Sequence, residues 1–188
     1  MSSKDPQDRA RAGVEARRRV PPEAHPALPR GDRPGPVQIL SDQNASRLPE
    51  LIEIRHTRMS ASPFTFYRGA AAVMAQDLAH TPVSGIDVRL CGDAHLANFG
   101  LFASPERALL FDINDFDESY PGPWEWDLKR LVASLVVAGR DNEFSTKQTR
   151  TIVVAAVRRY RDAMASFAGI ANLALWYARV DLEGVDGL

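Results

Sequence analysis

Apolar residues recur at helical spacing in four parts of the sequence. Leu48, Leu51 and Ile52 predict a helix over about residues 46–59, and an alanine-rich segment predicts another over 69–80. A third helix is predicted to stop at Gly139, with an apolar stripe of Leu128, Leu131, Val132, Leu135 and Val136. A fourth pattern runs from about residue 146 to 179, and its methionine and aromatic stripe is expected to face the core.

Two shorter segments have the pattern of strands. Side chains alternate between apolar and polar from Ile86 to Leu90, as in a half-buried strand, and a short apolar run extends from Ala108 to Ile113. Turn-forming residues follow the first of these segments and surround the second. We therefore expect one hairpin, with polar clusters on both sides of it.

The first 36 residues differ in composition from the rest. They are rich in proline and arginine and have almost no large apolar side chains. Such a segment buries too little surface to offset the entropy lost on ordering, so we predict a disordered tail over 1–36 and one domain over 37–188. An arginine-rich arm for an acidic partner is the alternative, although Asp and Glu residues dilute its charge.

Whole-chain composition narrows the class of protein. The 188 residues are 45% hydrophobic and 25% charged with a net charge of −1, which gives no electrostatic reason to expect a nucleic-acid partner. Cys91 is the single cysteine and favours a reducing compartment, so we expect a cytoplasmic protein. No apolar run approaches the roughly 20 residues of a membrane span, and no membrane association is expected.

The densest group of ionisable side chains lies between residues 91 and 118. Asp93, His95 and Asn98 occur on one turn-rich segment, and four carboxylates follow at Asp112, Asp115, Asp117 and Glu118. Carboxylates this close in sequence repel one another unless water or a cation neutralises them. A divalent metal is the natural counter-charge.

These residue types suit phosphoryl transfer. A carboxylate such as Asp93 can orient a hydroxyl and accept its proton, and the Asn98 carboxamide can coordinate Mg²⁺ without adding charge. Asp115, after the strand, can supply a further ligand to a metal that bridges phosphate oxygens. The order Asp-x4-Asn, strand, Asp-Phe-Asp therefore predicts a general base and a magnesium site.

Arg68 is the basic residue of interest before this region. It follows three aromatic residues in the segment SPFTFYRG, residues 62–69. The aromatics are expected to anchor a loop to the core. Arg68 itself either binds a phosphate or pairs with one of the downstream carboxylates, because guanidinium geometry suits bidentate contacts to both.

Four segments resemble those of the bacterial domain of unknown function family 2252, namely SPFTFYRG, CGDAHLANFG, FDINDFDES and GPWEWDLKRL. The similarity runs from about Leu40 to the end of the chain. Within it, GDAHLANFG and NDFDES resemble the catalytic and metal-binding loops of the aminoglycoside phosphotransferase and choline kinase group, which has a protein-kinase-like fold.

The resemblance implies a role for each matched residue. It makes Asp93 the catalytic base and Asn98 a magnesium ligand, and it matches Asp115 to the metal-binding aspartate of the second loop. Asp112 remains an alternative to Asp115 as the principal ligand, and Asp117 a supporting one. Asp127 resembles the aspartate that braces the catalytic loop from below, a structural role.

The resemblance also implies a fold and cofactors. We expect an α+β, mainly helical domain like the larger lobe of kinase-like enzymes, with a small β-hairpin carrying the site. Mg²⁺ and ATP are the implied cofactors, and a small molecule of unknown identity is the phosphoryl acceptor. The sequence before Asp93 has no glycine-rich phosphate loop, and none of the chain's three lysines, Lys4, Lys129 and Lys147, resembles the strand lysine that pairs with nucleotide phosphates. We therefore expect a truncated family member, inactive alone, whose fold a missing C-terminal region completes.

Two other functions fit the same residues. His95 with the aspartate cluster would suit a metal-dependent hydrolase, because imidazole and carboxylate together bind zinc or manganese. Alternatively, the acidic hairpin pairs with arginines such as Arg68, Arg89 and Arg130 in a non-catalytic scaffold or interaction domain.

Overall fold

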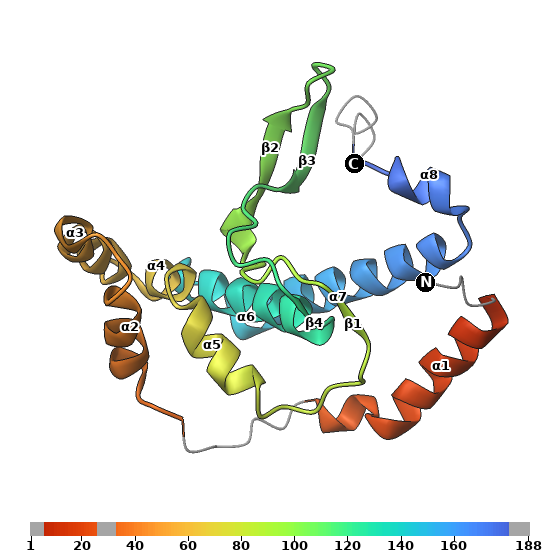
Figure 1. Cartoon of the computed structure of the whole chain (residues 1–188), viewed down its shortest axis with the longest axis horizontal. Helices are drawn as coiled ribbons and strands as arrows, with labels where there is room; N and C mark the ends of the chain where they lie inside the picture. Colours follow the sequence, from red (N-terminus) through yellow and green to blue (C-terminus); the bar gives the residue numbers. More distant parts are fainter. Residues whose placement is uncertain (1–5, 26–32, 181–188) are drawn as a thin grey trace.

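The computed structural model describes residues 6–25 and 33–180. Figure 1 shows a mainly helical α+β fold in which a β-hairpin stands away from the helices. The predicted fold class is thus confirmed at this level. Among the described helices, none is both long enough and apolar enough to cross a bilayer.

The N-terminal region contains a helix that the sequence analysis did not predict. Helix α1 spans Pro6–Arg19, and a 3₁₀ turn, η1, spans Pro22–Ala24. Its alanines and arginines are good helix formers, and Arg19 pairs with Glu15 one turn earlier. The prediction of a disordered tail is therefore wrong for residues 6–19, while residues 1–5 and 26–32 lie outside the described residues.

Four short helices follow. They are α2 (Pro36–Asn44), α3 (Pro49–Met59), α4 (Pro63–Arg68) and α5 (Ala71–Leu78). The helix predicted over 46–59 begins at Pro49 because proline is favoured in the first helical turn. The core is small and lies among α2, α3 and α5, where Ile39, Leu40, Met59, Ala70 and Val73 are buried.

Residues 63–68 form a helix rather than the predicted loop. Ser62 accepts a hydrogen bond from the Thr65 backbone at 3.2 Å, and Thr65 Oγ1 accepts one from the Ser62 N–H at 2.8 Å. This reciprocal capping box satisfies two donors at the start of α4. It fixes Arg68 at the last position of that helix.

The strands form two separate antiparallel pairs. β1 (Asp87–Arg89) pairs with β4 (Pro121–Pro123), and β2 (Phe99–Ala103) pairs with β3 (Leu109–Ile113) in the register Phe99 to Ile113. A hairpin between the two polar loops is therefore present, but its first strand, β2, was not predicted, and β1 pairs with β4 rather than with β3. β1 is exposed along its length, because a two-stranded ribbon leaves it uncovered, whereas a half-buried strand was expected.

The two longest of the described helices pack against each other. α6 (Glu125–Asp141) packs along α7 (Thr146–Ala168), where Trp124 stacks on Tyr160 with ring centroids 5.9 Å apart. The buried positions of α6 are polar or small, namely Glu125, Arg130, Ser134 and Gly139. The buried face of α6 therefore makes hydrogen bonds to polar groups of other segments.

The last predicted helix is divided in two. α7 ends at Ala168 with Gly169 as its C-cap, and α8 spans Asn172–Trp176. The expected core stripe is also wrong in this region, because Met164 and Phe167 are 49% and 36% exposed. Among the described residues, this part of the chain leaves an apolar face uncovered.

Candidate functional site

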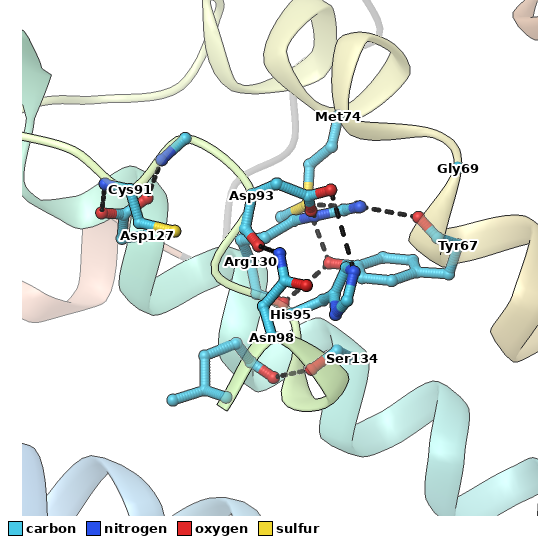
Figure 2. A network of polar contacts seen from close by, with 12 residues as sticks. Tyr67, Gly69, Met74, Cys91, Asp93, His95, Asn98, Asp127, Arg130 and Ser134 are labelled. Atoms are coloured by element: carbon cyan, nitrogen blue, oxygen red, sulfur yellow. Dashed lines mark hydrogen bonds and ion pairs between the residues drawn. The ribbon is translucent and has the colours of Figure 1, made fainter. Parts of the chain in front are cut away.

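The turn that carries Asp93 is fixed from below by Asp127 of α6. Asp127 Oδ2 accepts a hydrogen bond from the Cys91 N–H at 2.7 Å, and Oδ1 accepts one from the Gly92 N–H at 3.1 Å (Figure 2). Burial raises the pKa of Asp127, and these two hydrogen bonds offset part of that rise. The structural role expected for Asp127 is thus confirmed.

Asp93 is buried and held by Arg130. Its Oδ1 accepts a hydrogen bond from Arg130 Nε at 2.8 Å, and its Oδ2 lies 3.8 Å from Nε2 of His95. Arg130 also donates to the Tyr67 carbonyl at 2.6 Å, and its guanidinium lies 3.9 Å from the Tyr67 ring centroid. These contacts orient the Asp93 carboxylate, as Figure 2 shows.

Tyr67 completes this buried group. Its hydroxyl donates to the Arg130 carbonyl oxygen at 2.8 Å, and burial raises the pKa of Tyr67 to about 12. The phenol therefore stays neutral at physiological pH. Arg130 is consequently held at both its guanidinium and its backbone.

His95 lies beside Asp93 and is almost completely buried, with 3% of its surface exposed. Burial lowers the pKa of His95, and nearby Arg130 and Arg68 lower it further, while Asp93 acts in the opposite direction. Its Nδ1 has no hydrogen-bond partner in the part of the chain that the structure describes. A neutral imidazole is the favoured form at this position.

Asn98 closes the first loop. Its Nδ2 donates to the Asp93 carbonyl at 2.8 Å, which leaves the carboxamide oxygen available for another partner. The short turn η2 (Leu96–Asn98) is tied to α6, because the Leu96 N–H donates to the fully buried Ser134 hydroxyl at 2.9 Å. The Asn98 carbonyl accepts the Asn114 N–H at 2.8 Å and so connects the two loops.

The second loop carries the acidic residues after β3. Asp115 Oδ1 accepts the Asp117 N–H at 3.1 Å, and the Asp115 carbonyl accepts a hydrogen bond from Cys91 Sγ at 3.3 Å. Burial raises the pKa of Glu118, and the charges of Asp93, Asp115 and Asp117 raise it further. The second loop thus concentrates negative charge around Glu118.

A cleft of about 530 Å³ brings most of the predicted site residues together. Asp93, Asn98, Asp115, Asp117 and Arg68 all line it, although as many as 49 positions separate Arg68 from Asp117. Asp112 is not among its lining residues. It lies on β3, where its Oδ1 accepts the N–H of Ile113 at 2.8 Å.

The cleft also contains three arginines that sequence reasoning did not assign to it, Arg47, Arg55 and Arg58. His95 and Glu118, which belong to the ionisable group found in the sequence, line it as well. Within residues 6–25 and 33–180, no three His, Cys, Asp or Glu side chains converge as a ready metal site. Arg68 likewise forms no ion pair with the acidic residues there.

Arg130 is the main residue of this region whose contact with Asp93 was not predicted from the sequence. The sequence suggested it only as one arginine of a structural network, yet it makes the direct hydrogen bond to the carboxylate of the candidate base, at 2.8 Å. A signal for it was present in the sequence, because Arg130 follows Asp127 by three positions and shares its helix face. One face of α6 therefore serves both the turn at Cys91 and the carboxylate of Asp93.

Replacing Asp127 by alanine is expected to destabilise the fold by about 2 kcal/mol at pH 7, because two partly buried N–H groups lose their acceptor. Chemical denaturation of both proteins measures this difference. The pKa of Asp127 is raised on folding, so its contribution is largest below the ordinary Asp value of about 3.9 and falls as pH rises through the folded value. A difference that instead grows steadily from pH 4 to pH 7 would contradict this assignment.

Comparison with known proteins gives one result. A family model described as "Uncharacterized protein conserved in bacteria (DUF2252)" matches residues 47–187. No curated protein and no solved structure matches the chain. The matched region includes all of the cleft residues discussed above.

Proposed function

The chain belongs to this DUF2252 family of bacterial proteins, and from that premise we propose that its cleft is the base-bearing and metal-binding part of a kinase-like, Mg²⁺-dependent phosphotransferase. The observation that carries the proposal is the convergence of Asp93, Asn98, Asp115 and Asp117 on one cleft. They come from two loops that β2 and β3 separate, and such a set supplies the positioning and charge neutralisation that phosphoryl transfer requires.

Asp93 is proposed to act on the hydroxyl of the acceptor. Arg130 holds its Oδ1, so Oδ2 is the oxygen left for the hydroxyl proton. The acceptor oxygen bonds to phosphorus, the bond from phosphorus to the leaving oxygen breaks, and the proton passes to Asp93 Oδ2. The carboxylate needs no large movement for this role, because Arg130 and the turn at Gly92 already fix it.

The donor chemistry of the cleft fits Mg²⁺. Asn98 retains a free carboxamide oxygen, and Asp115 and Asp117 supply carboxylates at the same wall. Mg²⁺ in phosphoryl-transfer sites commonly takes one or two carboxylates with the remaining positions filled by water and substrate phosphates, so a complete protein cage is unnecessary. When bound, the ion would neutralise charge on the phosphate oxygens.

A second candidate function is the non-catalytic scaffold, and one observation favours it. The buried pair of Arg130 and Asp93 already satisfies one oxygen of the candidate base within the fold itself. Such pairs occur in structural networks as well as in active sites. The metal-dependent hydrolase has no comparable support, because Asp112 is outside the cleft and no ready metal-binding group of three occurs in the described part of the chain.

Replacing Asp115 by asparagine tests the phosphotransferase proposal. We expect ATP with Mg²⁺ to raise the melting temperature of the 188-residue chain, since a ligand that binds only the folded state stabilises it. The increase should be lost in Asp115→Asn and kept in the control Asp162→Asn, an exposed change on α7. Asp93→Asn should keep the Mg²⁺-dependent shift while reducing any phosphoryl transfer by about 10²- to 10⁴-fold. An identical shift in Asp115→Asn and the unmodified chain would refute the metal assignment.

A further inference from the structure

Four arginines line the cleft together with the acidic loops. Arg47 precedes α3, Arg55 and Arg58 lie on α3, and Arg68 ends α4. Arg55 and Arg58 are three residues apart, which places them on neighbouring positions of one helix face. We call these four residues the arginine wall.

The arginine wall forms no ion pair within the described structure, because none of its four side chains pairs with a carboxylate in residues 6–25 and 33–180. Arg55 donates from Nη2 to the Gly69 carbonyl at 2.7 Å, but its buried Nη1 has no hydrogen-bond partner among the described residues. Burial and the charge of Arg47 lower the pKa of Arg55, while the charge of Glu118 acts in the opposite direction.

The acidic side of the cleft has no close ion pair either. Asp115, Asp117 and Glu118 form none among the described residues. The two oppositely charged groups thus line one cleft without a direct ion pair between them. A ligand that carries several negative charges and binds a cation would neutralise both groups at once.

We propose that the arginine wall binds the phosphate groups of a ligand with at least two linked phosphates. Guanidinium groups pair with phosphate oxygens through two parallel hydrogen bonds, and several of them suit a polyanion better than a single carboxylate does. The cleft volume of about 530 Å³ lies within the range of small-molecule sites. This inference rests on the proposed function, because it assigns to arginines the phosphate contacts that a lysine and a glycine-rich loop make in other phosphotransferases.

Inorganic pyrophosphate in the absence of Mg²⁺ is the probe that isolates the arginine wall. Its affinity for the full chain is measured by calorimetry, first unmodified and then with Arg58→Gln and Arg68→Gln combined. Each arginine contributes charge-assisted hydrogen bonds, so we expect affinity to fall about tenfold per substitution and about 100-fold in the double variant. The control combines Arg150→Gln and Arg158→Gln, two exposed arginines of α7, and should change affinity less than twofold as an estimate for distant charges.

Arg47→Gln provides an independent measurement. Arg47 is exposed and precedes α3, so its substitution leaves the helices intact and should again weaken pyrophosphate about tenfold. Competition with ATP identifies the source of the phosphates. If ATP binds at least tenfold more tightly than pyrophosphate, the natural ligand is a nucleotide. Equal affinities indicate that the phosphates alone are recognised, as for a phosphorylated acceptor. Both results support phosphate binding by the arginine wall.

Two results would overturn the inference. One is an unmodified chain that does not bind pyrophosphate, and the other is an arginine double variant that binds it no more weakly than the control. Asp115→Asn separates this outcome from failure of the proposed function, because it should leave pyrophosphate binding without Mg²⁺ unchanged or slightly stronger. Loss of the Mg²⁺-dependent shift in Asp115→Asn with unaffected arginine variants would keep the metal site and reject the arginine wall.

Discussion

Replacing Arg130 by methionine is expected to lower the free energy of unfolding by about 3 to 5 kcal/mol, which is the usual cost of removing one partner from a buried ion pair. Arg130 is only 3% exposed, and its pairing with Asp93 is the contact that compensates this buried carboxylate. Methionine preserves much of the side-chain volume, so the loss arises mainly from the unpaired charge rather than from a cavity. The contact with the Tyr67 carbonyl is lost as well.

Urea denaturation of Arg130→Met, Asp93→Asn and the double variant measures this coupling. The double variant should be less destabilised than the sum of the single variants, because neutralising Asp93 removes the charge that Arg130→Met leaves unpaired. Arg161→Met is the matched control, since the exposed pair of Arg161 and Asp162 should contribute less than about 1 kcal/mol. Additive effects within about 0.5 kcal/mol would show that Arg130 and Asp93 do not stabilise each other.

Local sequence patterns correctly predicted the elements whose structure depends mainly on neighbouring residues. The alanine-rich segment forms α5, the apolar run after residue 108 forms β3, and the stripe that begins near Asp127 forms α6. Two elements differ from the prediction because a capping residue decides where a helix begins or ends. The capping box of Ser62 and Thr65 converts an expected loop into α4, and Gly169 interrupts a pattern that reads as one continuous helix.

The candidate site divides in a similar way between local and tertiary determinants. Loop residues such as Asp93 and Asn98 were identifiable because turns and short spacings place them on one segment. Of the arginine wall, Arg68 was identifiable from its sequence context, but the other three arginines were not, because their approach to the acidic loops depends on how α3 packs against the rest of the chain. Asp112 was predicted to belong to the site because it is close in sequence to the acidic loop. It lies instead on β3, outside the cleft.

Gly92→Ala is expected to destabilise the fold by about 3 kcal/mol or more and to disturb the position of Asp93. Gly92 has a φ of 88°, a conformation that costs an L-residue about 1 to 2 kcal/mol. A Cβ at this position would also overlap the carbonyl oxygen of Glu118, which is backbone and cannot rotate away. Overpacking of this kind adds about 1 to 3 kcal/mol.

Gly85→Ala is the control that separates these two causes. Gly85 has a similar φ of 77°, but the nearest atom to an added Cβ is Arg19 Nη2 at 3.6 Å, an ordinary contact. Its substitution should therefore cost only the backbone part, about 1 to 2 kcal/mol. Denaturation gives both values, and the ATP and Mg²⁺ melting shift should be lost in Gly92→Ala and kept in Gly85→Ala. Equal destabilisation by the two substitutions would mean that the first loop does not pack against Glu118, and the two loops would then not be held together at the cleft by this contact.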